Sequence, residues 1–319
     1  MSEQTIPVVS LEDWTSGDAD RRAHFAKTVG DALTDLGFFA LTNHGVDQDL
    51  IKNGYAEVQS FFDLPEAAKK AYELAELNGQ RGYISVGREH AKDHPVPDLK
   101  EFWHVGPEIP TDSPHHPAQN YARNLWPAEL PQFKPTLLEL YGQLERCAGA
   151  LLEACAIYAG EPEGLFRDMA IGGDTILRTI HYPPVAEDAH PAAIRAAAHE
   201  DINLITLLVE STDEGLELLQ RDGTWRPIHA LDGHMVVDSG DMLQHITNGL
   251  FKSTTHRVVN PADDRSRRFS MPFFVHPRGE VDLTPLPSCV AKTGGEVKYP
   301  NRTAREYLDL RLAEIGLKK

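Results

Sequence analysis

Cysteine is scarce in this sequence and forms no motif. Only three cysteines occur among 319 residues, and no two of them are separated by two residues. A CxxC metal or redox motif and an even-numbered disulfide framework are therefore both excluded. Cys147 and Cys155 fall within an apolar run with helical spacing, which predicts reduced core thiols in a cytoplasmic protein.

Long apolar runs and excess positive charge are also missing. The first ten residues, MSEQTIPVVS, contain no signal-peptide core, and no apolar run approaches the length that spans a membrane. The chain has 31 Lys and Arg against 48 Asp and Glu, a formal net charge of −17. Phosphates are repelled by such a charge, so we expect neither nucleic acid nor a membrane surface as a partner. A small molecule is the expected partner, and the sequence indicates no oligomeric state.

The first half of the chain has mainly helical periodicity. Apolar residues recur at helical spacing over 18–37, where Gly37 ends the run, and again over 47–62. The longest helix is expected over 131–159. Between these helices, residues 79–120 are rich in Gly, Pro and His and have no sustained period, which predicts a long irregular segment of functional importance.

Short strands replace helices after residue 173. Turn residues separate eight short runs, which read TILRTIHY, INLITLLVE, LELLQ, TWRPIHA, HMVVDSG, MLQHIT, STTHRVVN and RRFSMPFFVHP. Such spacing predicts a β-sandwich or jelly roll. A last helix is expected from Asn301, which we predict to be its N-cap. The fold class is thus α+β, with helices packed around a β core.

A His-x-Asp motif precedes one of these strands. His199 and Asp201 stand directly before the apolar run 202–209 and would share one face of its strand, and His256 follows 55 positions after Asp201 on another strand. Two imidazoles and one carboxylate on a rigid β scaffold match the ligand set of non-haem Fe(II) oxygenases, which leaves one face of the metal open. About two His-x-acid motifs are expected by chance in a chain of this composition, so a structural hydrogen-bonded pair is the alternative.

A second constellation lies in RRFSMPFF. Arg268 and Ser270 are two residues apart on a predicted strand, so both side chains emerge on one face. Ser270 opens an apolar run, which indicates that this face is buried. An Arg guanidinium and a Ser hydroxyl together form a carboxylate-binding pair. The alternative is a solvated basic edge, since Arg265 and Arg267 are close by.

Together these motifs resemble a known family. HED at 199–201, GDMLQHITNGLFKSTTHRVV at 240–259 and RFS at 268–270 are similar to the iron- and 2-oxoglutarate-dependent oxygenases of the isopenicillin N synthase-like family. LGFFALTNHGV at 36–46, RGY at 81–83, DLKEFWHVG at 98–106 and LRTIHYPP at 177–184 extend the resemblance upstream. The resemblance covers most of the chain, and the motifs follow one another in the same order as in the family.

The resemblance implies a double-stranded β-helix (jelly roll) core with an N-terminal helical region, a long backing helix and a C-terminal helix. The corresponding division is 1–120, 121–170, 171–280 for the core and 281–319. His199, Asp201 and His256 would be the catalytic metal ligands. The cofactors would be Fe(II), the cosubstrate 2-oxoglutarate and O₂, with succinate and CO₂ released as a small molecule is hydroxylated, desaturated or cyclised.

The resemblance also places the cosubstrate. Arg268 and Ser270 would hold the distal carboxylate of 2-oxoglutarate, and Tyr182 would assist them. The sequence departs from the commoner plant pattern at Ile180, where Asn is usual, so polar support from that position is missing. Arg178 shares a strand face with Tyr182, and it is either a pocket residue or a structural ion-pair partner.

The substrate itself has no readable signature. The candidates for substrate contact are Tyr83, His104, Arg178 and Phe274, and the role of His245, within the β region, stays open. An iron-dependent oxidase of the same fold that does not use 2-oxoglutarate is one alternative function. A ligand-binding protein that has lost catalysis is another, although the three intact metal-ligand positions disfavour it.

Overall fold

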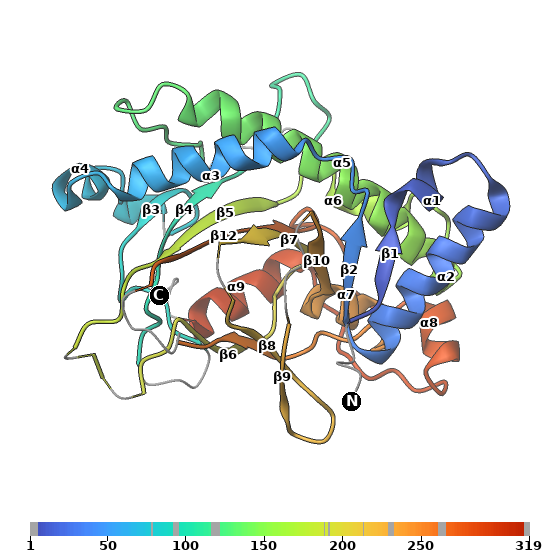
Figure 1. Ribbon diagram of the computed structural model, residues 1–319. Coiled ribbons are helices and arrows are strands. Elements are labelled where there is room, and N and C mark those ends of the chain that lie inside the picture. Colours follow the sequence, from blue (N-terminus) through green and yellow to red (C-terminus); the bar gives the residue numbers. More distant parts are fainter. Residues whose placement is uncertain are drawn as a thin grey trace.

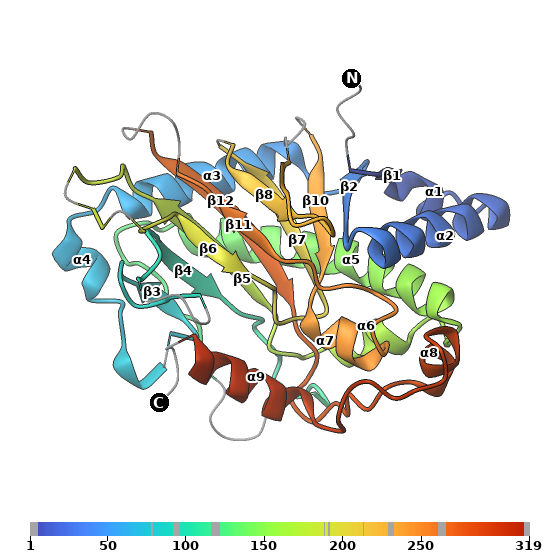
Figure 2. The same cartoon turned by 90° about the horizontal axis from the view of Figure 1, so that it is seen from below.

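Two β-sheets and a layer of helices make up the protein (Figure 1). The computed structural model describes residues 6–315, except for residues 78, 92–95, 116–121, 188, 191, 213, 229–232 and 261–265. Helices cover one face of a large sheet, and a smaller sheet lies against its other face (Figures 1 and 2). The fold class is therefore α+β.

The large sheet has the strand order β1-β2-β10-β7-β12-β5-β4-β3. Its strands are β1 (Val8–Ser10), β2 (Phe38–Thr42), β3 (Gly82–Ile84), β4 (Glu101–Val105), β5 (Ile176–Tyr182), β7 (Ile205–Ser211), β10 (Met235–Ser239) and β12 (Arg268–Val275). Only the β1–β2 pair is parallel among these described pairs. Strands from the N-terminal part of the chain thus form both edges of the sheet, and later strands lie between them.

The small sheet is antiparallel and has the order β6-β11-β8-β9. Its strands are β6 (Ala196–His199), β8 (Leu216–Leu219), β9 (Trp225–Pro227) and β11 (His256–Val258). Apolar side chains from both sheets, such as Phe38 and Val236 of the large sheet and Leu218 of the small one, pack together between them. The space between the sheets is therefore partly a hydrophobic core.

The helices have clear local start and stop signals. They are α1 (Leu11–Thr15), α2 (Ala19–Asp35), α3 (Gln48–Phe62), α4 (Glu66–Lys70), α5 (Phe133–Ala159), α6 (Leu165–Ala170), α7 (Asp241–Ile246), α8 (Pro287–Lys292) and α9 (Ala304–Glu314), with a 3₁₀ turn at Ala75–Leu77. The side chains of Asp18 and Asp47 cap the first turns of α2 and α3. Helix α5 ends at Gly160, whose φ of 84° is left-handed.

The main hydrophobic core lies between the large sheet and the helices. Leu144 of α5, Leu207 of β7 and Phe273 of β12 are fully buried in it. The helices thus share their core with the sheet. None of the helices in the described ranges has the length and apolar character needed to cross a membrane.

Four sequence-based predictions about this fold were wrong in detail. The run MLQHIT, predicted as a strand, is helix α7, because a short apolar run fits both periods and Met242 and Ile246 are buried one helical turn apart. The irregular segment 79–120 contributes the strands β3 and β4. Residues 101–105 are buried on both faces, so they show no alternation. The N-cap of α9 is Thr303, which forms a capping box with Glu306, and not Asn301.

The fourth correction concerns the His-x-Asp motif. It does not begin the strand that follows, which starts at Ile205. His199 is the last residue of β6 in the small sheet, and Asp201 lies in the connection to β7 in the large sheet. The motif therefore sits where the chain crosses from one sheet to the other.

Candidate metal centre and adjoining cavities

Two histidines and one aspartate meet at this crossing. His199 on β6 pairs with His256, the first residue of β11, and their ring centroids are 4.4 Å apart. Asp201 Oδ1 lies 3.9 Å from His199 Nε2 and 3.8 Å from His256 Nε2. Within the described ranges, this is the one group of three His, Cys, Asp or Glu side chains whose ligand atoms converge, all within 4.8 Å.

Backbone contacts orient both imidazoles toward this point. Nδ1 of His199 lies 2.7 Å from the carbonyl oxygen of Ala197, and Nδ1 of His256 lies 3.2 Å from that of Thr254. A carbonyl oxygen only accepts, so each Nδ1 carries the proton and each Nε2 offers a lone pair. Burial, and then the proximity of His256, lower the pKa of His199 to about 4, which keeps that ring neutral.

The aspartate is oriented by a neighbouring hydroxyl. Thr206 Oγ1 donates a hydrogen bond to Asp201 Oδ2, while Oδ1 faces the two imidazoles. Asn203 Nδ2 in turn donates to Thr206 Oγ1 over 3.0 Å. Two imidazoles and one oriented carboxylate fit a divalent transition metal, and such a three-ligand set leaves coordination positions for exogenous ligands.

A narrow inner cavity extends from these three residues between the two sheets. Its volume is about 70 Å³, and Arg268, Ser270 and Tyr182 also line it. Arg268 and Ser270 are neighbours on one face of β12 and are almost fully buried, at 1% and 2% exposure. Tyr182 pairs with Arg268 in the sheet register, and the guanidinium lies 5.0 Å from the centre of its ring. A buried cation here is placed to bind an anionic ligand.

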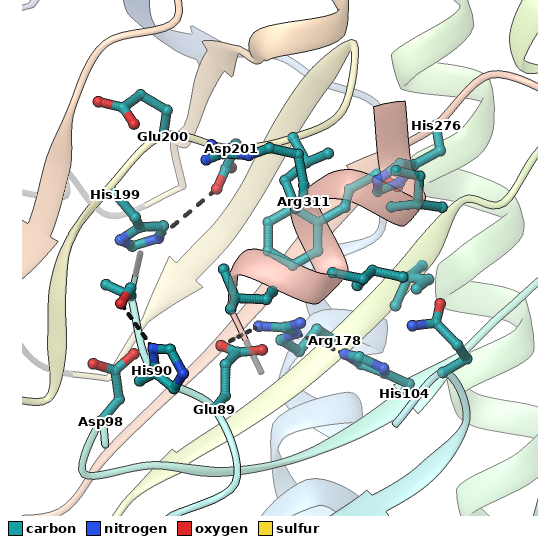
Figure 3. A pocket seen from close by; sticks show the side chains of 18 of the residues that line it. Glu89, His90, Asp98, His104, Arg178, His199, Glu200, Asp201, His276 and Arg311 are labelled. Carbon is teal, nitrogen blue, oxygen red and sulfur yellow. Dashed lines mark hydrogen bonds and ion pairs between the residues drawn. The ribbon is translucent and has the colours of Figure 1, made fainter. Parts of the chain in front are cut away.

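A wider outer cavity adjoins the inner one (Figure 3). Its volume is about 260 Å³, and helix α9 contributes part of its wall through Leu308 and Leu312. The residues that line both cavities are Lys100, Arg178, His199, Asp201 and Phe274. His199 and Asp201 therefore stand where the two cavities meet.

A cluster of four charged side chains lies in the wall of the outer cavity. Lys100 Nζ is 2.7 Å from Glu89 and 2.8 Å from Asp98, and Arg178 Nη1 is 3.1 Å from Glu89. Burial alone raises the pKa of Glu89, but Arg178 and Lys100 hold it well below its usual range. Burial likewise opposes the charge of Lys100, yet Asp98 and Glu89 raise its pKa. All four groups are positioned as charge-balanced partners.

His104 fixes the position of Arg178. Its Nδ1 donates to the carbonyl oxygen of Gly79 over 2.8 Å, and its Nε2 accepts from Arg178 Nε over 2.6 Å. The pKa of His104 is held well below its usual value by burial and then by the charge of Arg178. The ring is thus a neutral acceptor for the guanidinium, as Figure 3 shows.

Most of the predicted site residues come together around these cavities. His104, Arg178 and Phe274 line the outer cavity, and Arg178 is both a cavity residue and an ion-pair partner. Tyr83 does not line either described cavity, because its side chain is directed to the helix side of the sheet, where its hydroxyl bonds to Glu101. The two described cavities therefore give no support to its predicted contact with substrate, which stays a prediction.

His245 is also remote from the cavities. It lies on α7, its Nε2 is 2.7 Å from the carbonyl oxygen of Pro300, and its ring packs against Tyr299. Ile180, where the family pattern favours Asn, does line the inner cavity.

Sequence reasoning missed several polar cavity residues. Glu89, Asp98 and Lys100 lie in the segment without periodicity, and their ion pairs depend on contacts that no local pattern records. His276, which follows β12, also lines the outer cavity. Thr206 could have been found from the sequence. It places a hydroxyl inside an apolar strand, five residues after Asp201, and a buried hydroxyl needs a hydrogen-bond partner.

The site combines two imidazoles and one carboxylate, and it opens toward a cavity that contains a buried arginine. This arrangement is typical of mononuclear non-haem metal enzymes. Comparison with known proteins specifies this further. Residues 6–129 match the family model for the N-terminal region of non-haem dioxygenases in morphine synthesis. Residues 173–277 match that of the 2OG-Fe(II) oxygenase superfamily.

Similar proteins extend over nearly the whole chain. Validamycin A dioxygenase from Streptomyces hygroscopicus subsp. limoneus is 30% identical over 95% of this chain and 85% of its own length. A Caulobacter crescentus protein assigned to the 2OG-Fe(II) oxygenase family has 38% identity and a TM-score of 0.84, covering 97% of this chain and 98% of its own. A full-length Neurospora crassa protein in complex with alpha-KG and thymine has 29% identity and a TM-score of 0.84, covering 98% and 97%.

The chain belongs to the 2OG-Fe(II) oxygenase superfamily. It is a non-haem dioxygenase that uses Fe(II), 2-oxoglutarate and O₂. The class predicted from the sequence is thereby confirmed, including its cofactors.

Proposed function

We propose that His199, Asp201 and His256 bind the Fe(II) and that Arg268 and Ser270, assisted by Tyr182, hold the distal carboxylate of 2-oxoglutarate. The observation that carries this assignment is the shared inner cavity. The Nε2 atoms and Asp201 Oδ1 converge in its lining, and the buried Arg268 lines it too.

In this proposal the two sheets correspond to the double-stranded β-helix of the family. The inner cavity lies between them, which supports that correspondence. The division of the chain into 1–120, 121–170, 171–280 and 281–319 stays a prediction.

The reaction depends on positioning by the protein. Iron with 2-oxoglutarate and O₂ supplies the oxidising chemistry, with release of succinate and CO₂. Arg268 orients the cosubstrate from the end opposite to the metal. Residues shared by the two cavities, Phe274 and Arg178 among them, hold a substrate C–H bond close to the open side of the metal. The apolar side chains of α9 limit the access of water from the outer cavity.

The substrate in this proposal is a small molecule that occupies the outer cavity and contacts His104, Arg178 and Phe274. The Neurospora crassa structure with thymine is one case in which a similar protein binds a ligand of that size. A cytoplasmic location and the absence of nucleic-acid and membrane partners stay predictions, and hydroxylation, desaturation and cyclisation all fit this site.

Anaerobic titration tests the proposal. Fe(II) and 2-oxoglutarate added together to the protein should give the visible charge-transfer band of the chelate, and each alone should not. Admission of O₂ should then yield succinate. If the Arg268→Ala variant formed the same band as the wild-type protein, the cosubstrate assignment would be contradicted. The absence of any band from the wild-type protein would favour an iron-dependent oxidase that does not use 2-oxoglutarate.

A further inference from the structure

We infer that the outer cavity selects an uncharged substrate over an anionic one, and that Arg178 donates a hydrogen bond to a carbonyl-type oxygen of that substrate. This inference rests on the proposed function, because it assumes that the outer cavity is the substrate site. It names the chemical class of the substrate.

The cations of the outer cavity already have protein partners. Among the described residues that line it, the Lys and Arg side chains are Lys100, Arg178 and Arg311. Lys100 and Arg178 share the carboxylate of Glu89, as described above. Arg311 pairs with two further carboxylates, Glu314 at 2.9 Å and Asp241 at 3.6 Å. Within the described lining, an anionic substrate therefore meets no Lys or Arg side chain that lacks a carboxylate partner.

Negative charge prevails in the same lining. The carboxylates are Glu89, Asp98, Asp174, Glu200 and Asp201, five against three cations. A bound Fe(II) and the dianionic cosubstrate cancel each other, so they do not reverse this balance. A carboxylate or phosphate that entered would lose its hydration without gaining a compensating charge.

Arg178 nevertheless retains hydrogen-bonding capacity. Its guanidinium stacks on the rings of Phe102 and Phe274, at 4.3 and 5.2 Å from their centres. Nε is held by His104 and Nη1 by Glu89, and Nη2 has no hydrogen-bond partner among the described residues. The planar group is thus fixed by four neighbours, with one donor edge left for a ligand.

A fixed donor whose charge is neutralised suits a neutral acceptor. A carbonyl oxygen accepts such a hydrogen bond at a small desolvation cost, whereas a carboxylate does not recover its larger cost. Phe274, which lines both cavities, offers an aromatic surface next to this donor. The cavity is therefore complementary to a compact molecule with a carbonyl group and a flat apolar part.

Three probes of similar size and different charge test this inference. They are 4-methylbenzamide, 4-methylbenzoate and 4-methylbenzylammonium, added at millimolar concentration to the anaerobic protein loaded with Fe(II) and 2-oxoglutarate. The change in the visible charge-transfer band reports their binding. We expect the amide to bind at least about tenfold more tightly than the benzoate. Equal or tighter binding of the benzoate than of the amide, or no response to any probe, would overturn the inference.

Two variants sharpen the test. Glu89→Gln removes the counter-ion of Arg178 and should shift the benzoate-to-amide affinity ratio about tenfold toward the benzoate. The matched control is Asp174→Asn, which removes one lining charge that pairs with Arg305 instead of Arg178, and it should move the ratio much less. If the affinity ratio shifted equally in both variants, net charge alone would explain the preference, and the proposed role of Arg178 would be overturned.

Arg178→Met gives independent evidence if Glu89→Gln does not fold. It removes the donor and should weaken amide binding about tenfold. The wild-type preference remains informative even if neither variant folds. Failure of the proposed function can be distinguished from failure of this inference. In the first case the wild-type protein would form no charge-transfer band, whereas a normal band with the wrong probe preference would overturn only this inference.

Discussion

His199 and His256 face each other across the antiparallel pair of β6 and β11, with their imidazole centroids 4.4 Å apart. Two cationic imidazoles could not be held this close at low cost. Their Nδ1 atoms both donate to backbone carbonyl oxygens, which directs both Nε2 atoms to one place. The strand register thus prepares two metal bonds before any ion binds.

Removal of any of the three ligand side chains should abolish iron binding. We expect His199→Ala, Asp201→Ala and His256→Ala to lose stoichiometric Fe(II) and uncoupled succinate production while they remain folded, because each removes one of only three protein ligands. Metal analysis and succinate assays check this, with exposed His24→Ala as the control. Normal succinate output from all three variants would refute the assignment.

Arg268→Lys should weaken the binding of 2-oxoglutarate. Lysine keeps the charge but loses the planar pair of donors, so the affinity should fall about 10-fold to 100-fold, from roughly 1.5–3 kcal/mol per charge-assisted hydrogen bond. Titration of the charge-transfer band measures it. The matched control is Arg267→Lys, since Arg267 is the preceding residue and bonds to His181 and Asp63 instead. An unchanged affinity in Arg268→Lys would contradict the proposed role.

Thr206→Val should weaken iron binding without touching a ligand. The substitution keeps the shape of the side chain but removes the hydroxyl that donates to Asp201 Oδ2. Loss of such a supporting contact typically costs about 10-fold to 100-fold in metal affinity. Competition with a chelator measures the affinity, and Thr206→Ser, which keeps the hydroxyl, is the control. If Val and Ser variants bind Fe(II) equally well, the hydroxyl does not orient the carboxylate.

Acid should destabilise the protein partly through His104. This buried ring has a pKa well below 6.5, so the unfolded chain binds a proton that the folded chain does not once the pH falls below 6.5. Stability is then lost as the pH falls, by at most about 1.4 kcal/mol per pH unit for this group. Urea midpoints should decline less steeply with acidification in His104→Asn than in the wild-type protein. Exposed His24→Asn should follow the wild-type slope, and a parallel decline in all three proteins would exclude His104 as a contributor.

Local patterns predicted the long elements and the ligand types. The helices at 18–37, 47–62 and 131–159 have a 3.6-residue period over several turns, and the structure has helices at these places. The spacing of His199, Asp201 and His256, together with the resemblance of the surrounding motifs, was enough to predict that these three side chains come together.

Contacts between distant segments could not be predicted in this way. The run 202–209 was read as one strand because its apolar character continues, yet the chain leaves one sheet before Ile205 and enters another. Similarly, nothing in the local sequence around Glu89 shows that Lys100 and Arg178 share its carboxylate. The charge selectivity that we infer for the outer cavity depends on such nonlocal pairs, so it required the structure.

The interleaved strand order of the large sheet has a consequence for biosynthesis. Phe39 of β2 pairs with Val237 of β10, about 200 positions further along the chain. At typical translation rates, about 10 to 40 s pass between the synthesis of these two strands. During that interval β2, which is almost entirely apolar, has an unpaired edge that can pair with other nascent chains. The yield of folded protein in a cell therefore depends on how well this strand is shielded until β10 has been made.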